Sequence, residues 1–183
     1  RVKDYAAEDA DVTLQLKEVL STILKENNGE NLFYTVENPL VYVLSDMEMT
    51  GVKVDEETLK IFSKELEIDI RNLEETIYEK AGVKFNIASP KQLGEVLFDK
   101  LQLDPKAKKT KTGQYQTGED VLSALSSKHD IVQYILDFRS LQKLKSTYVD
   151  ALPELINPKT GRVHTTYGQA VAVTGRLASN NPN

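Results

Sequence analysis

The sequence predicts a mainly α fold, in which two long antiparallel helices carry a small helical insertion and a short β segment follows at the C-terminus. Apolar residues recur every three or four positions over 55–82 and again over 131–155, which is the period of an amphipathic helix. Residues 162–173 instead alternate in the manner of a strand. Two helices of this length bury their apolar faces most simply by packing on each other.

The first of these helices is expected to begin after Asp55, a good N-cap residue, and to end near Gly82. The second is expected to run from Ile131 to Leu155 with a spacing close to a heptad, which places Tyr148 in the apolar seam. Antiparallel packing then brings residues near 59–62 beside those near 152–155. At the other end it brings 77–81 beside 131–135.

The insertion between the long helices contains two further helical signals. A Ser-Pro-Lys start at 89–91 predicts a helix that ends near Leu101, and another short helix is expected over 119–126. The lysine-rich stretch 104–118 lies between them and has no apolar period, so it is interpreted as a basic, mobile loop.

Two shorter helices are expected before residue 52. The first begins near the acids Asp9 and Asp11, presents one apolar face, and ends at the Asn-Asn-Gly of 27–29. The second opens at Asn38-Pro39 and closes at Thr50-Gly51. A strand stub follows at 52–54.

The C-terminal part is expected to be a tight turn at 157–161 followed by the strand 162–173. A strand without a sheet exposes an unpaired edge, so we expect a two-stranded ribbon, association with another chain, or poor order there. The first residue is not Met and the last ones follow a lone strand, which we interpret as a piece of a larger protein.

The composition is that of a folded chain: 183 residues, 40% of them hydrophobic and 28% charged. Cysteine is absent and only two histidines occur, which excludes disulfide scaffolds, thiolate metal sites and His-rich zinc sites. No apolar run reaches the roughly 18–20 residues of a membrane span, so no membrane partner is expected. The lack of cysteine and of a signal peptide favours the cytoplasm.

Charge is divided unevenly along the chain. Residues 1–99 hold 11 Lys and Arg against 21 Asp and Glu, whereas residues 100–183 hold 12 against 7. The overall net charge of −5 therefore combines a part at −10 with a part at +5. Such a division can give one surface a positive potential suited to nucleic acid, or the charges can be unevenly distributed but all fully solvated.

Several short motifs resemble those of the family A DNA polymerases of bacteria, in the family's order and at its spacing. They are Tyr-Ala-Ala-Glu-Asp-Ala-Asp at 5–11, Met-Thr-Gly-Val-Lys-Val-Asp at 49–55, Ser-Pro-Lys-Gln-Leu at 89–93, Leu-Lys-Ser-Thr-Tyr at 144–148, Asn-Pro-Lys-Thr-Gly-Arg-Val-His-Thr at 157–165 and Thr-Gly-Arg-Leu at 174–177. The resemblance implies that residues 1–30 end a 3′–5′ exonuclease domain, 38–156 form the thumb, and 157–183 begin the palm.

The resemblance also implies an activity for the larger protein. Family members are DNA-directed DNA polymerases, nucleotidyltransferases of replication and repair that use Mg²⁺ and deoxynucleotides. Their catalytic carboxylates lie in later palm motifs, beyond residue 183. The chain by itself is therefore expected to grip primer–template duplex DNA without a cofactor and without catalysis.

By the same resemblance, Tyr5 and Asp9 correspond to the third exonuclease motif, in which the Asp is a metal ligand and the Tyr orients the attacking water. The partner acids would lie before Arg1. From spacing alone, Asp9 is an ordinary acid near a helix start.

Candidate DNA-binding residues fall into four groups. Ammonium groups on a loop suit phosphate contact without base readout, and a helix N-terminus offers free N–H groups. The third group consists of cations that flank the apolar seam of the second long helix. The fourth consists of polar residues that follow the tight turn at 157–161. The candidates are Lys91, Lys106, Lys108, Lys109, Lys111, Arg139, Lys143, Lys145, Arg162, His164, Thr165, Arg176 and Asn183.

Arg176 is the most specific of these candidates. The guanidinium is a rigid fork of donors, and purine N3 and pyrimidine O2 are minor-groove acceptors present in every Watson–Crick pair. An Arg that contacts them accepts any correct pair, as a copying enzyme requires. Gly175 beside it is interpreted as a position where the backbone approaches another group closely. By the resemblance, Asn183 corresponds to a template-contacting position.

A second hypothesis from a different class is open. The two long helices could form a non-catalytic interaction module, whose apolar groove accepts a partner helix. Salt-dependent binding of duplex DNA favours the polymerase interpretation, whereas salt-insensitive association through exposed Leu and Ile favours the module.

Overall fold

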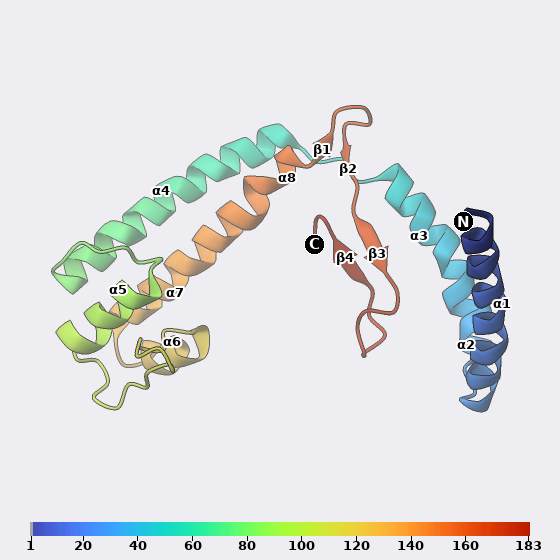
Figure 1. Cartoon of the computed structure of the whole chain (residues 1–183). Helices are drawn as coiled ribbons and strands as arrows, with labels where there is room; N and C mark the ends of the chain where they lie inside the picture. Colours follow the sequence, from blue (N-terminus) through green and yellow to red (C-terminus); the bar gives the residue numbers. More distant parts are fainter. Residues whose placement is uncertain (1) are drawn as a thin grey trace. The chain divides into compact units, whose positions relative to one another are not determined.

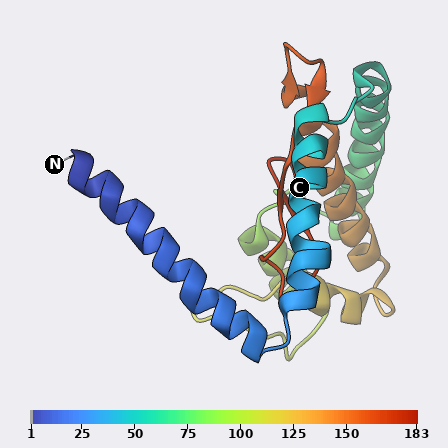
Figure 2. The same ribbon diagram turned by 90° about the vertical axis from the view of Figure 1, so that its right-hand side faces the viewer.

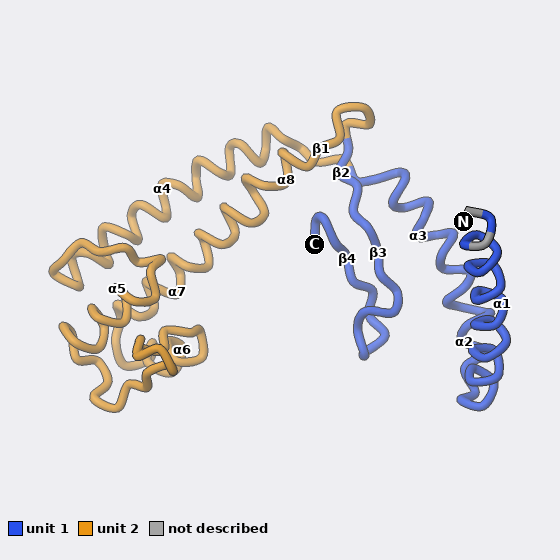
Figure 3. The backbone as a smooth tube through the Cα atoms, in the orientation of Figure 1, with its two compact units in different colours: residues 1–52, 162–183 blue, residues 53–161 orange. Residues whose placement is uncertain are grey.

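The computed structural model in Figure 1 describes residues 2–183, with the side chains of residues 2 and 4 left out. The chain divides into two compact units (Figure 3). Unit 1 combines the chain up to Val52 with residues 162–183, and unit 2 is the continuous stretch 53–161. Helices dominate, as the sequence predicts, and the strands found within residues 2–183 are short.

Unit 2 is built on two long helical runs that lie side by side in Figure 1. Its elements are α4 (Glu56–Ala81), α5 (Pro90–Gly94), the π-helical turn η2 (Glu95–Lys100), α6 (Glu119–Ser126), α7 (Asp130–Lys143), the π-helical turn η3 (Leu144–Val149), α8 (Ala151–Glu154) and β1 (Ile156–Asn157). The Asp55 carboxylate caps α4 by accepting the Thr58 N–H at 3.1 Å. Gly82 ends that helix in the left-handed conformation, with φ +63°.

The antiparallel arrangement of the long helices is confirmed by contacts at both ends. The Ser63 hydroxyl donates to the Asp150 carboxylate at 2.6 Å. Toward the other end, the Lys80 ammonium lies 5.3 Å from the centre of the Tyr134 ring. These pairs match the register that the apolar spacing predicts.

The core of unit 2 lies where the insertion packs against the pair of long helices. Ile77 from α4, Leu97 from η2, Leu122 from α6 and Ile135 from α7 have no exposed surface. The insertion therefore shares its core with the long helices, and its position is fixed by apolar burial.

Tyr148 is a correction to the sequence analysis, because its side chain is 42% exposed and not part of the seam. The π-helical turn η3 explains the difference. Asp150 N–H donates to Lys145 C=O, a five-residue step that adds one residue to the turn. The extra residue rotates the following side chains, so that Val149, 4% exposed, points inward in place of Tyr148.

Asp150 connects η3 to α4, and we expect its replacement to change the response of the chain to acid. The Lys145 ammonium at 2.7 Å, and then the Ser63 hydroxyl, hold the pKa of Asp150 below its ordinary value. A depressed carboxyl pKa stabilises the folded state above the unfolded pKa, and this contribution disappears as pH falls through the folded value. Asp150→Asn should therefore lower the free energy of unfolding at pH 7 by about 0.5–1 kcal/mol, since the group is half exposed.

Urea unfolding at pH 7 and between pH 4 and pH 2 checks this expectation. The difference between wild type and Asp150→Asn should shrink as the pH falls. Asp69→Asn removes the same charge from α4 and serves as the control. If both variants lose the same free energy of unfolding, or if the loss in Asp150→Asn does not depend on pH, the stabilising role of the Asp150 carboxylate is contradicted.

Unit 1 contains α1 (Val2–Glu26), α2 (Glu30–Leu32), the π-helical turn η1 (Phe33–Glu37), α3 (Asn38–Thr50), β2 (Arg162–Val163), β3 (Thr166–Gly168) and β4 (Ala178–Asn180). Helix α1 begins well before Asp9 and Asp11, so these acids lie within the helix and not at its start. Figure 2 shows α1 diverging from the run that α2 opens. Its apolar face is largely exposed, with Leu16 at 53% and Leu20 at 56%.

The helix expected to open at Asn38-Pro39 in fact continues a run that begins at Glu30. A proline inside a helix clashes with the carbonyl four residues earlier and leaves it without a donor. Helix α3 does begin at Asn38, with Pro39 in its first turn as expected, and the wide turn η1, which ends at Glu37, relieves the clash with the helical run before it.

The prediction of one strand over 162–173 is wrong in its extent, because the structure has only the short strands β2 and β3 there. Antiparallel β3 and β4 pair Thr166 with Asn180 and Gly168 with Ala178, so that of the three outcomes expected for this region the two-stranded ribbon is the one observed. Residues 169–177 form the loop that joins them. The Gln169 amide donates at 2.9 Å to both the carbonyl and the carboxylate of Glu37, and these bonds draw the chain out of the strand.

A cluster of backbone bonds joins the end of α3 to β2 and β3. Val52 and Val163 exchange both N–H···O bonds, at 2.8 and 2.9 Å. Arg162 donates to the Gly51 carbonyl at 3.1 Å, and a His164 ring nitrogen lies 2.7 Å from the Glu48 carbonyl oxygen. We call residues 48–52 with 162–167 the strand clasp.

Gly51 is the least replaceable residue of the strand clasp. Its φ of +65° and ψ of 176° belong to a region that essentially only glycine occupies. A Cβ there would also lie 2.8 Å from the Val163 carbonyl oxygen and 2.7 Å from the His164 ring. We expect Gly51→Ala to destabilise unit 1 by roughly 2–3 kcal/mol.

Amide exchange of Val52 and Val163 measures this loss directly. Gly118→Ala is the matched control, because Gly118 has φ −65° and open space around the Cβ position. Equal exchange rates in wild type and Gly51→Ala would refute the assignment.

Candidate nucleic-acid interface

Residues 104–118 form a short hairpin, which we call the basic hairpin. The Thr110 N–H donates to Gln114 C=O at 2.7 Å, the Gln116 N–H donates to Lys108 C=O at 2.9 Å, and Lys109 pairs with Tyr115. Gly113 makes the turn, with φ +80°. The mobile loop expected from the sequence is therefore an element with its own hydrogen bonds.

Tyr115 anchors the basic hairpin on the helical insertion. Its ring centre lies 5.0 Å from that of Phe98, and its hydroxyl donates to the Asp99 carboxylate at 2.5 Å. That hydrogen bond is the main cause of a raised pKa of the Tyr115 hydroxyl. Gly94 lets the ring approach, since a Cβ there would lie 2.8 Å from the Tyr115 Cβ.

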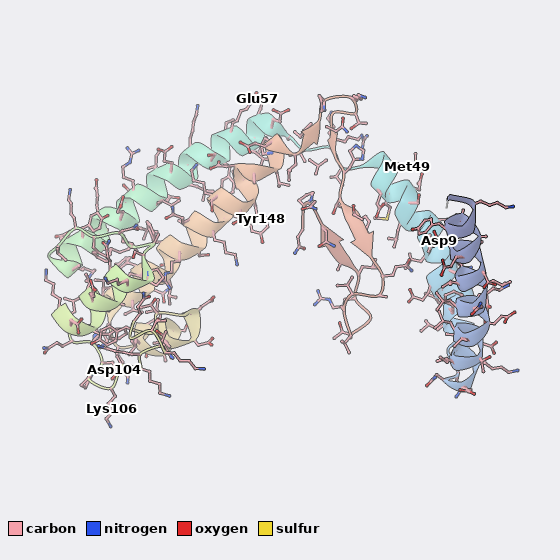
Figure 4. The ribbon with its side chains drawn as sticks, viewed as in Figure 1. Asp9, Met49, Glu57, Asp104, Lys106 and Tyr148 are labelled. Atoms are coloured by element: carbon pink, nitrogen blue, oxygen red, sulfur yellow. The ribbon has the colours of Figure 1, made fainter. Side chains whose placement is uncertain are left out.

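The four lysines of the basic hairpin are exposed. The Asp104 carboxylate accepts the Lys106 N–H at 2.9 Å and fixes the local turn. Figure 4 shows the Lys106 side chain pointing away from the helices. Lys109 differs from the others, because its ammonium lies 4.3 Å above the Tyr115 ring. The structure thus gathers all four candidate loop lysines on one ordered element.

A groove of about 910 Å³ lies beside α7 and α6. The candidates Arg139 and Lys143 line it together with the carboxylates of Glu119 and Asp137, and so does Tyr148, whose exposure the sequence analysis missed. Cations interleaved with an aromatic ring are typical of surfaces that hold a nucleic-acid backbone and stack on bases. The available signal was the pair of lysines at 143 and 145 close to Tyr148.

The third candidate on this run, Lys145, does not line the groove. Its ammonium pairs with Asp150 at 2.7 Å, and its side chain is only 23% exposed. The structure therefore gives Lys145 a part in holding η3, and its DNA contact stays a prediction.

Lys91 lies exposed on α5, which has only five residues. The Ser89 hydroxyl accepts the Gln92 N–H at 3.5 Å, the ordinary cap geometry. A second hollow, of about 610 Å³, is lined by Pro90, Thr110, Gln116 and Arg139 among others, without Lys91.

Three candidates of unit 1 make hydrogen bonds to the main chain. Arg162 and His164 belong to the strand clasp described above. The Thr165 hydroxyl lies 3.0 Å from the Asn180 carbonyl oxygen and 2.7 Å from that of Pro182. These side chains hold the β3–β4 ribbon and the end of α3, so their contact with DNA stays a prediction.

Arg176 is exposed in the loop between β3 and β4. The adjacent Gly175 has φ +75°, and nothing lies within 4 Å of its Cβ position, so the turn rather than a close approach explains the glycine here. The Asn183 side-chain oxygen accepts the Ser179 hydroxyl at 3.2 Å.

Tyr5 and Asp9 lie one turn apart on α1, where Tyr5 is 67% exposed and Asp9 is also exposed. Among the side chains that the structure describes, no three carboxylate, His or Cys groups converge on a point that could hold a metal ion. Asp9 therefore has no co-ligands within the described residues, and we assign no metal-dependent step to it.

These features fit the class of helical modules that contact a phosphate backbone: an ordered lysine hairpin beside a groove lined by cations and an aromatic ring. Over residues 2–183, none of the helices is both long enough and apolar enough to cross a membrane. The chain belongs to DNA polymerase family A, whose sequence model matches residues 56–183.

Named relatives agree with this membership. The chain is 49% identical over 183 residues to DNA polymerase I of Chloroflexus aurantiacus, covering 98% of this chain and 19% of the relative. It is 51% identical over 168 residues to DNA polymerase I of Geobacillus stearothermophilus, covering 92% and 19%. It therefore spans about a fifth of the length of these curated relatives.

The fold matches a solved structure, the POL domain of Pol1 from M. smegmatis in complex with DNA primer–template and dNTP. The TM-score is 0.78 and the sequence identity 40%, over 93% of this chain and 30% of the other. The likeness thus covers most of this chain.

Proposed function

We propose that this chain is part of a DNA-directed DNA polymerase and that unit 2 grips primer–template duplex DNA by its backbone. The observation that carries the proposal is the basic hairpin, which presents its lysines beside the groove that Lys143 and Tyr148 line, in a family A chain. The M. smegmatis structure, whose POL domain is complexed with primer–template and dNTP, supports the same assignment.

The parts of the chain then take the following roles. Residues 1–30 belong to a 3′–5′ exonuclease domain, 38–156 to the thumb and 157–183 to the start of the palm. Arg176 reads minor-groove acceptors, and Asn183 contacts the template strand. The exposure of the loop that carries Arg176 supports its role.

In the larger protein we propose nucleotidyl transfer from deoxynucleotides with Mg²⁺, during replication and repair in the cytoplasm. The metal would supply Lewis-acid stabilisation of the transferred phosphate. The described residues of this chain supply the grip on the duplex. We expect no nucleotide incorporation and no exonuclease activity from this chain by itself, because the family resemblance assigns the catalytic carboxylates to motifs that these residues do not contain.

Fluorescence anisotropy with a labelled hairpin primer–template, measured over a salt series, tests the proposal. If roughly four cations reach phosphates, log K against log salt has a slope of about −3 to −4. The dissociation constant should lie in the non-specific range of roughly 10⁻⁴–10⁻⁶ M. A slope near zero contradicts the proposal.

The interaction-module hypothesis receives less support. The hollow between α4 and α7 is lined by Asp69, Asn72, Thr76, Asp137 and Ser140 as well as two leucines. Carboxylates and hydroxyls in this position do not suit an apolar partner helix. Salt-insensitive association of the chain would nevertheless favour that hypothesis.

A further inference from the structure

Arg139 connects α7 to the basic hairpin by a single hydrogen bond. Its Nη1 donates to the Thr117 carbonyl oxygen at 2.5 Å, across 22 residues of sequence. Thr117 is only 6% exposed, and Arg139 itself is half-buried. The bond therefore joins two segments at a site that is shielded from water.

The surroundings of Arg139 differ from those of the other cations on this surface. Among the described residues, no carboxylate lies within 4.0 Å of its guanidinium, so the backbone carbonyl is its strongest partner. Burial disfavours the charged form and lowers the pKa of this side chain. Lys143, one turn further along α7, is exposed and lines the same groove.

Besides the packing of Ala107 on the core, two contacts of the hairpin act on different parts of it. Tyr115 holds its centre on Phe98 and Asp99. Thr117, at the end of the C-terminal arm, is held by Arg139. With both points fixed, the exposed lysines of the hairpin keep one position relative to α7.

We propose that Arg139 is a positioning residue, which fixes the basic hairpin against α7 and so sets where Lys106, Lys108 and Lys111 meet a nucleic-acid backbone. It acts through the hairpin and does not itself neutralise a phosphate. A contact surface that is ordered before binding loses less conformational entropy on association. The effect of Arg139 on DNA binding rests on the proposed function. Its effect on the order of the hairpin does not.

The first test needs no DNA. Amide exchange is compared in wild type, Arg139→Gln and Lys143→Gln, the last being a matched loss of charge one turn away. A hydrogen bond from a charged donor stabilises the closed hairpin against local opening. We therefore expect the amides of Thr110 and Gln116 to exchange roughly 10-fold faster in Arg139→Gln than in wild type. Exchange in α4 should be unchanged, which shows that the variant is folded.

Lys143→Gln should leave hairpin exchange at the wild-type rate. Unchanged hairpin exchange in Arg139→Gln overturns the proposal. If Arg139→Gln fails to fold, Asp99→Asn with Tyr115→Phe tests the remaining attachment instead. That variant should leave exchange at Gln116 slow if Arg139 holds the arm, and fast exchange there overturns the proposal.

The second test is a double-mutant cycle on duplex binding. In a chain already lacking Lys106, Lys108 and Lys111, Arg139→Gln should cause less than about a 2-fold further loss, because coupled residues are non-additive. Lys143→Gln should reduce binding by the same factor in both backgrounds. A full additional loss for Arg139→Gln means that it contacts phosphate directly, which overturns the proposal. A wild-type chain that binds no duplex refutes the proposed function, while the exchange data still decide whether Arg139 holds the hairpin.

Discussion

Replacing Lys106, Lys108 and Lys111 together by alanine lowers the affinity of the chain for duplex DNA by roughly 10- to 100-fold at about 50 mM salt. The reason is that each lysine which reaches a phosphate releases condensed counterions, a term independent of base sequence. The loss should accordingly be the same on AT-rich and GC-rich duplexes. The slope of log K against log salt should become shallower by about 2 to 3.

Lys109 is left in place in that variant because its ammonium lies over the Tyr115 ring and helps to hold the hairpin. The matched control replaces Lys53, Lys60 and Lys64, three exposed lysines in and just before α4. It removes the same charge from a surface where acids outnumber bases. Anisotropy titrations in which both triple variants lose equal affinity would show that net charge, and not the hairpin, governs binding.

Ile135→Ala should destabilise unit 2 by roughly 3–4 kcal/mol, the second large effect expected. Ile135 has no exposed surface and belongs to the core that the insertion shares with the long helices. Truncation leaves a cavity that the close-packed neighbours fill only in part. Because the basic hairpin stands on this core, duplex affinity should fall together with stability.

Chemical unfolding measures this destabilisation, and Ile68→Ala is the matched control. Ile68 lies on α4 with 58% of its surface exposed, so its truncation should cost less than about 0.5 kcal/mol. A similar loss for both variants would mean that the assigned core does not carry the stability of the unit.

Local signals predicted the long helices well, for reasons that are visible in the structure. Asp55 accepts the Thr58 N–H, and Gly82 adopts the left-handed conformation, as their residue types favour. The apolar period then set the register, which the Ser63–Asp150 bond confirms. These features depend on neighbours a few residues away, so sequence is sufficient for them.

The errors arise where individual hydrogen bonds override the apolar period. Tyr148 occupies a seam position by count, but the π-helical turn that contains it rotates it outward. Alternation predicted a long strand after Arg162, yet the Gln169–Glu37 bonds end it early. A periodic pattern does not encode either contact.

The sequence predicted which residues of the candidate site are exposed cations, but not the hairpin that arranges them. The lysines of 104–118 are on the surface, as expected, but their order depends on Tyr115, Gly94 and Arg139. A single aromatic residue in a polar stretch and a glycine within a helix were the available signals. Without their long-range partners, neither indicates a hairpin.

Acetylation of lysines by an amine-reactive reagent, with and without duplex DNA, tests the central claim most directly. Mass spectrometry reads each lysine separately, so the chain carries its own controls. The account predicts strong protection by DNA at Lys106, Lys108, Lys111 and Lys143, and none at Lys53, Lys60 and Lys64. Protection of the α4 lysines in place of the hairpin, or no protection at saturating DNA, would contradict it.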